Sequence, residues 1–222
     1  MSANHKNKKS ILFDYDGVIV DTLPAYAGTV TELAHQFGNK REITEEIIRE
    51  RWGGGWQSLY EHTLGIPKAN VGKAIDLYRS LMQNQPHSPL FEGMREAIEE
   101  LSRDYRLFII TASKTSDVFE TLKFYGITVF EDVCGQDLLP NIRKGDPRYF
   151  SEPMQKWGIS PGDAMSIGDT VDEISMGKKM GIATVACAWG WQSTDLLKGA
   201  NPDTIIESPH QLPAAVRALL PV

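Results

Sequence analysis

Residues 11–22 constrain the fold most, because an apolar run ends there abruptly at two acidic residues. Residues 11–13 are all apolar, which is typical of a strand covered on both faces of a parallel sheet. Asp14 and Asp16 follow directly, at the strand end where open α/β sheets bind their ligands. Because alternate side chains of an extended chain lie on the same side, we expect the two carboxylates to converge.

Two carboxylates this close repel each other and need a cation or a shared proton. One interpretation is a polar strand end, which explains one aspartate better than two. A calcium-binding loop starting at Asp14 fails on spacing, since its sixth position is Ile19 instead of Gly and its twelfth is Ala25 instead of Glu. The third interpretation is an active site, in which one aspartate is nucleophile and metal ligand and the other is acid and base.

Strand-like and helix-like patterns alternate along the rest of the chain from residue 89 onward. Apolar runs predict strands, and three- and four-residue apolar spacing predicts helices. The expected strands are 107–110, a weaker one around Val133, 164–167, 183–188 and 205–206, and the expected helices are 94–105, 116–125, 147–157, 174–180 and 212–220. Such alternation indicates an α/β fold of the Rossmann type, with a parallel sheet and helices on both faces.

The intervening residues 23–88 are predicted to be a helical insertion. Helical patterns cover residues 23–37, a segment from 45, residues 56–64 and residues 68–82. Thr44 is well placed to cap a helix start, and Gly38 is a plausible helix end. We therefore expect an α/β core domain of residues 1–22 and 89–222 and a helical domain of residues 23–88.

Composition limits the possible partners and compartment. The formal net charge of −6 argues against nucleic acid or an anionic membrane as the main partner. Cys134 and Cys187 show no pairing pattern, which fits a reducing cytosol. No apolar run is long enough to span a membrane, and the first ten residues lack the apolar core of a signal peptide. These features predict a cytoplasmic protein. The sequence leaves open whether it is a monomer or a homodimer.

Three later segments carry residues suited to phosphate chemistry. Thr111 follows a predicted strand and precedes a helix, where a hydroxyl and free backbone N–H groups can hold a phosphate. Lys144 lies in a loop before a helix and offers a fixed positive charge, with Lys114 as the alternative. Asp169 ends a predicted strand and opens a helix, so it can face the same edge of the sheet as Asp14.

In this order, these segments resemble the four motifs of the haloacid dehalogenase superfamily, in its phosphatase and phosphomutase branch. The resemblance implies a phosphatase that needs Mg²⁺ and forms an aspartyl phosphate. It implies one set of roles in catalysis and phosphate binding: nucleophile Asp14, acid and base Asp16, and phosphate contacts from Gly17, Thr111, Ala112 and Lys144. It implies metal ligands from Asp14, Asp169, the backbone carbonyl of Asp16, and Glu173, with Asp172 as the alternative to Glu173.

The branch is indicated by further resemblances. Asp16 excludes the dehalogenases and phosphonatases, and the insertion resembles the superfamily's cap domain. Arg51 and Gly54 lie in a segment similar to the specificity loop of phosphoglycolate phosphatases, which implies that they contact the substrate. Residues 188–193 resemble the same group, although Trp189 and Trp191 are equally well explained by packing.

We therefore expect a phosphomonoesterase acting on a small phosphorylated metabolite similar to phosphoglycolate. One alternative is a phosphosugar mutase of the β-phosphoglucomutase type, which residues 112–114 resemble, although the histidine expected after Thr22 is absent. The other alternative is a non-catalytic relative that only binds its ligand.

Overall fold

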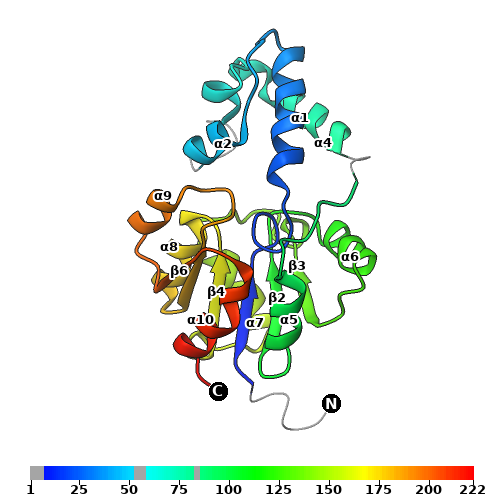
Figure 1. Ribbon diagram of the computed structural model, residues 1–222. Coiled ribbons are helices and arrows are strands. Elements are labelled where there is room, and N and C mark those ends of the chain that lie inside the picture. Colours follow the sequence, from blue (N-terminus) through cyan, green and yellow to red (C-terminus); the bar gives the residue numbers. More distant parts are fainter. Residues whose placement is uncertain (1–7, 53–58, 83–85) are drawn as a thin grey trace.

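The centre of the molecule is a parallel β-sheet, seen in a computed structural model that describes residues 8–52, 59–82 and 86–222 (Figure 1). Its strand order is β3-β2-β1-β4-β5-β6, and all the neighbouring pairs are parallel. The strands are β1 (Ser10–Phe13), β2 (Arg106–Ile110), β3 (Phe130–Cys134), β4 (Ala164–Gly168), β5 (Ala183–Cys187) and β6 (Thr204–Ile206). The expected α/β fold is confirmed.

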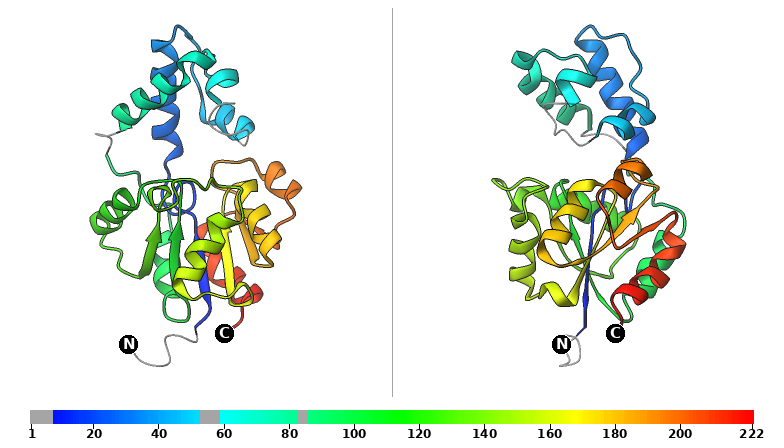
Figure 2. Two further views of the ribbon diagram at one scale, coloured as in Figure 1. Left: turned by 180° about the vertical axis from the view of Figure 1, so that it is seen from behind. Right: turned by 90° about the vertical axis from the view of Figure 1, so that its left-hand side faces the viewer.

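Helices cover both faces of the sheet because successive strand residues point to opposite sides. Ile11 and Phe13 belong to one buried cluster, whereas Leu12 between them belongs to another. The first cluster includes residues of α5 (Met94–Leu101), α6 (Thr115–Phe124) and α10 (Leu212–Leu219). The second includes residues of α7 (Arg148–Trp157) and α8 (Val171–Met180). Both layers are visible in the side view of Figure 2.

The boundaries of some core helices differ from those predicted. The helix expected over 94–105 ends at Leu101. Tyr105 has the spacing of a buried helix residue and is buried, but it lies beyond the helix. Its hydroxyl donates a hydrogen bond to the Leu220 carbonyl at 2.8 Å. Helix α8 begins three residues before the predicted start, and α9 (Thr194–Gly199) was not predicted.

The insertion is helical, as expected, and stands above the carboxyl ends of the strands (Figure 1). It contains α1 (Leu23–Gln36), α2 (Glu45–Arg51), a π-helical turn (Leu59–Thr63), a 3₁₀ turn (Lys68–Asn70) and α4 (Val71–Met82). The predicted role of Thr44 at the helix start is confirmed, since its Oγ1 accepts a hydrogen bond from the Ile47 amide at 3.4 Å in the first turn of α2. Residues 56–58 of the predicted helix 56–64 lie outside the described residues.

The insertion has a hydrophobic core of its own and a narrow connection to the sheet. Its buried cluster is drawn from residues 23–74, joined by Trp191 from the α/β part. The two connecting segments lie side by side: the Asp21 amide donates to the Pro89 carbonyl at 2.8 Å, and the Phe91 amide donates to the Ile19 carbonyl at 3.2 Å. These contacts support the proposed division into a core (1–22 and 89–222) and a cap (23–88).

If the cap is a separate domain, Leu33→Ala should loosen it without loosening the sheet. Leu33 is fully buried in the cap cluster, so its truncation should cost about 2–4 kcal/mol of local stability. Native-state hydrogen exchange should then accelerate in α1 and α4 and stay slow in β1 and β2. Ile98→Ala, an equally buried change in α5, should accelerate exchange in the strands. Uniform acceleration by both variants would contradict the division.

Candidate active site

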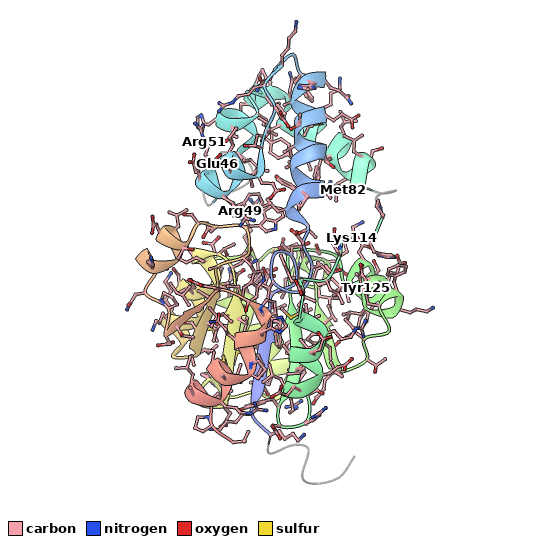
Figure 3. The ribbon with its side chains drawn as sticks, viewed as in Figure 1. Glu46, Arg49, Arg51, Met82, Lys114 and Tyr125 are labelled. Atoms are coloured by element: carbon pink, nitrogen blue, oxygen red, sulfur yellow. The ribbon has the colours of Figure 1, made fainter. Side chains whose placement is uncertain are left out.

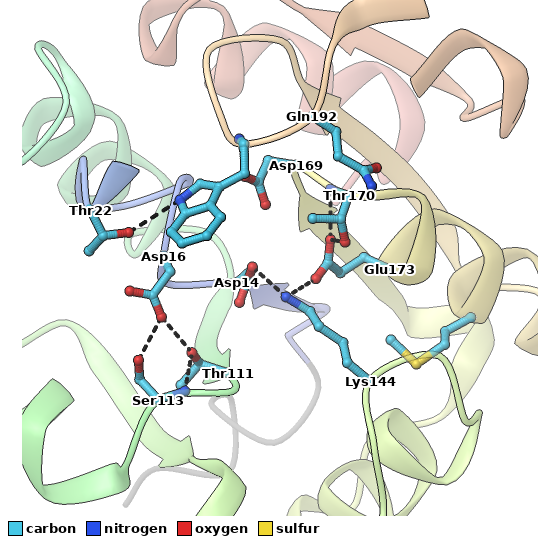
Figure 4. Close-up of polar contacts among 12 residues, drawn as sticks. Asp14, Asp16, Thr22, Thr111, Ser113, Lys144, Asp169, Thr170, Glu173 and Gln192 are labelled. Carbon is cyan, nitrogen blue, oxygen red and sulfur yellow. Dashed lines mark hydrogen bonds and ion pairs between the residues drawn. The ribbon is translucent and has the colours of Figure 1, made fainter. Parts of the chain in front are cut away.

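The sheet order brings three polar strand ends together. Asp14 follows β1, Thr111 follows β2 and Asp169 follows β4, and β2 and β4 are the two neighbours of β1. The Asp14 amide continues the ladder by donating to the Ile167 carbonyl at 2.9 Å. All three side chains are buried. These three residues are far apart in the sequence, yet they lie together at one edge of the sheet, as the sequence predicted (Figure 4).

Three buried carboxylates form the centre of this site. Asp14, Asp169 and Glu173 each offer an oxygen, and these oxygens lie within 4.8 Å of one another. Lys144 reaches into the group, with its Nζ 2.7 Å from Asp14 Oδ2 and in an ion pair with Glu173 Oε1. Both Lys144 and Asp169 thus lie where the sequence placed them.

The positive charge of Lys144 does not balance the negative charges of the three carboxylates. Burial raises the pKa of Asp14 well above its usual value, and the nearby Lys144 ammonium only partly offsets this. Burial and the Glu173 charge raise the pKa of Asp169 to about 7. Although burial disfavours the charge of Lys144, the carboxylates of Asp14 and Glu173 hold its pKa well above the ordinary value.

The donor set fits a hard divalent cation. Asp14 Oδ1 and Asp169 Oδ1 are buried and accept no hydrogen bond from any residue in the described part of the chain. Buried carboxylate oxygens without partners are costly unless a cation meets them. All the ligand atoms on offer are oxygens, the type that Mg²⁺ prefers. Asp14, Asp169 and Glu173 can therefore hold such an ion.

Glu173, and not its neighbour Asp172, lies in the acidic group. Its Oε2 accepts hydrogen bonds from the Thr170 amide at 2.9 Å and the Thr170 hydroxyl at 2.5 Å. These contacts close the first turn of α8 and leave Oε1 toward Lys144. Asp172 is exposed. The early start of α8 at Val171 is thus what directs Glu173 inward.

Asp16 is held apart from the acidic group by two hydroxyls. Its Oδ2 accepts hydrogen bonds from Ser113 at 2.6 Å and Thr111 at 3.4 Å. Burial raises the pKa of Asp16, and the Ser113 hydrogen bond counteracts part of that increase. A raised pKa favours a carboxyl group that can carry a proton. Ser113 had no role in the sequence prediction, although it lies only two residues after Thr111.

The phosphate contacts implied by the resemblance stay predictions, but their surroundings are defined. Ala112 is exposed, and its amide has no hydrogen-bond partner in the described segments. The Gly17 amide already donates to the Val20 carbonyl at 2.9 Å. Gly17 has a positive φ of 76°, and a Cβ there would overlap Asp169 and Trp191. A larger residue at this position would disturb the site.

On cap helix α2, Arg49 contacts the core, whereas the predicted Arg51 is exposed. Arg51 is exposed at the end of α2, and Gly54 lies outside the described residues. Arg49, on the same helix, reaches the core and donates to the Trp189 carbonyl at 3.4 and 3.5 Å (Figure 3). A substrate contact of Arg51 stays a prediction. The Arg49 contact joins residues 140 positions apart in the chain, so no local sequence signal indicates it.

Comparison with known proteins identifies the family. The haloacid dehalogenase-like hydrolase family matches residues 11–187, which include all of the acidic group. The chain therefore belongs to the haloacid dehalogenase-like hydrolases. Within that family it is a phosphatase related to phosphoglycolate phosphatases and PpaX-type phosphatases, as the relatives below indicate.

The curated relatives match nearly the full length of the chain. The probable phosphatase IndB of Dickeya dadantii is 27% identical, covering 96% of this chain and 95% of its own. A phosphoglycolate phosphatase of Vibrio parahaemolyticus is 25% identical over 92% and 94% of the two chains. The pyrophosphatase PpaX of Bacillus velezensis is 28% identical over 93% and 95%.

A solved structure agrees in fold. A haloacid dehalogenase-like protein from Streptococcus pneumoniae superposes with a TM-score of 0.81 at 24% identity, covering 94% of this chain and 98% of its own. The core and the helical insertion therefore follow a known arrangement. Among the described helices, none has the length and apolarity needed to cross a membrane.

The raised pKa of Asp169 predicts how pH affects the metal-free protein. Unfolded aspartate titrates near pH 3.9, so between about pH 4 and 7 the folded protein binds more protons and loses stability as pH rises. In EDTA, Asp169→Asn should melt roughly 5–15 °C higher than wild type at about pH 8, and this difference should shrink as the pH falls and vanish below about pH 4. The measurement is thermal unfolding at a series of pH values.

The exposed Asp163→Asn variant is the control and should follow the wild-type pH profile. An advantage of Asp169→Asn that does not grow with pH would contradict the electrostatic explanation.

Proposed function

We propose that this phosphatase hydrolyses small phosphate monoesters in two steps, with a phosphoryl group carried on Asp14. The observation that carries the proposal is the buried Asp14 carboxylate at a strand end, in contact with Lys144 and beside Asp169 and Glu173. In the proposed first step this carboxylate attacks phosphorus opposite the leaving oxygen. The products of the first step are an aspartyl phosphate and an alcohol.

In this proposal Asp16 moves the protons. It donates its proton to the leaving alkoxide and later takes a proton from the water that attacks the aspartyl phosphate. Its raised pKa supports the first role. Ser113 and Thr111 fix its carboxylate in the structure.

Lys144 and Thr111 hold the phosphoryl oxygens in the proposed mechanism. Lys144 already contacts the carboxylate that accepts the phosphoryl group, so its ammonium lies close to the developing charge. The exposed Ala112 amide adds a backbone donor. Asp14, Asp169, Glu173 and the Asp16 carbonyl would hold Mg²⁺, which when bound supplies positive charge at the phosphoryl oxygens.

For the substrate, we propose a small ester similar to phosphoglycolate. Several relatives are named phosphoglycolate phosphatase, which supports this choice. The mutase alternative is distinguished by its product, since a mutase converts a phosphosugar without net release of phosphate. A phosphate-release screen over small esters, with and without Mg²⁺, tests the substrate class directly.

Asp14→Asn should abolish turnover, because an amide cannot attack phosphorus. The expected loss in kcat is more than about 10³-fold, measured as phosphate release from the best ester of the screen. Asp195→Asn, a fully exposed change on α9, is the matched control and should keep wild-type activity. Activity of Asp14→Asn within tenfold of wild type would exclude Asp14 as nucleophile.

Asp16→Ala should separate the two steps. An alkyl ester leaves as a basic alkoxide and needs the proton, so its hydrolysis should slow by about 10²–10⁴-fold. A nitrophenyl ester needs little protonation, so it should give a burst of nitrophenolate and then stall. The trapped intermediate should appear as a phosphate-mass adduct on Asp14 that hydroxylamine removes.

Ser113→Ala keeps the Asp16 carboxylate and removes only its 2.6 Å hydrogen bond, so it should turn over without accumulating the adduct. Equal slowing of both ester types by Asp16→Ala, without burst or adduct, would mean that Asp16 has only a structural role.

A further inference from the structure

The loop after β5 packs directly on the metal-site acid Asp169. The Trp191 amide donates a 2.5 Å hydrogen bond to Asp169 Oδ2. At Gly190, a Cβ would overlap the Asp169 side chain, so the loop backbone lies against that residue. The loop thus fixes Oδ2, whereas Oδ1 is buried and accepts no hydrogen bond from the described residues.

The ring of Trp191 belongs to the cap. It lies in the buried cluster of the insertion, with its centroid 4.4 Å from Trp52 and 4.7 Å from Tyr26. Its indole nitrogen donates to Thr22 Oγ1 at 3.3 Å, at the point where the chain enters the cap. One residue thus contacts the Asp169 carboxylate through its backbone and the cap core through its side chain.

Gln192 makes a second link between the cap and the acidic group. Its buried side chain accepts a 2.6 Å hydrogen bond from the Val171 amide, in the first turn of the helix that carries Glu173. The same side chain donates a 2.7 Å hydrogen bond to the Trp52 carbonyl at the end of α2. Both Asp169 and the start of α8 are therefore connected to the same end of one cap helix.

We propose that Trp191 is a positioning residue that couples the docking of the cap on the core to the orientation of Asp169. The inference rests on the proposed metal-binding role of Asp169. Moving the cap away pulls on the Trp191 ring, and the ring moves the amide that fixes Asp169 Oδ2. Because such coupling is reciprocal, binding of the metal ion must also favour the docked cap.

Titration of EDTA-stripped protein with Mg²⁺ alone, followed by calorimetry, tests this inference without any substrate. Trp191→Ala keeps the amide but removes the ring, so its Kd for Mg²⁺ should rise about 5- to 50-fold, within the usual range of coupling between sites. Trp191→Phe keeps an aromatic ring in the cap cluster and should restore affinity to within about threefold of wild type, because the ring supplies the connection. Leu33→Ala is the control for a general loosening of the cap, since it truncates another buried residue of the same cluster and leaves Trp191 intact.

Hydrogen exchange supplies the reciprocal measurement. In wild type, Mg²⁺ should slow exchange in α2 (Glu45–Arg51), and Trp191→Ala should lose this effect. Should Trp191→Ala not fold, Gln192→Ala, which removes the second link, should show the same loss of affinity to a smaller extent.

The outcomes separate the two proposals. Wild-type protein that binds no Mg²⁺ would overturn both the metal site and the inference. Wild-type protein that binds Mg²⁺, with Trp191→Ala binding equally well or Leu33→Ala binding equally poorly, would overturn the inference alone.

Discussion

Concentrated negative charge at the ends of β1 and β4 is the constraint on which the site depends. Three carboxylates are removed from water there, and burial makes each charge expensive unless a cation is close. Lys144 supplies one positive charge from the segment between β3 and α7. The Lys144 loop and the β5–α9 loop both contact these acids, and α8 carries one of them.

The strand order converts distant sequence positions into one site. β1 lies between β2 and β4, so the crossovers leave it in opposite directions, and in open α/β sheets ligands bind beyond the carboxyl end of a strand at such a position. Asp14 occupies that position, with Thr111 on one side and Asp169 on the other. Successive residues of β1 and β2 belong alternately to the two buried clusters, which fixes the register, because a slip of one residue would turn each side chain toward the wrong helix layer.

Much of this arrangement could be predicted from the sequence because its signals are local. Largely apolar runs before Asp14, Thr111 and Asp169 marked the strand ends, and Thr44 marked a helix start that the structure confirms. The contacts of Ser113, Arg49 and Gln192 could not be predicted. Each joins segments far apart in the chain, and the residue types themselves are common on any polar surface.

The side-by-side path of the two connecting segments has an evolutionary consequence. Because residues 19–21 and 89–91 hydrogen-bond to each other, the chain leaves the sheet and returns to it at a single point. A different excursion of any length could be spliced in there without altering the strand register. The specificity of such an enzyme can therefore be exchanged as a module, while the catalytic framework is inherited unchanged.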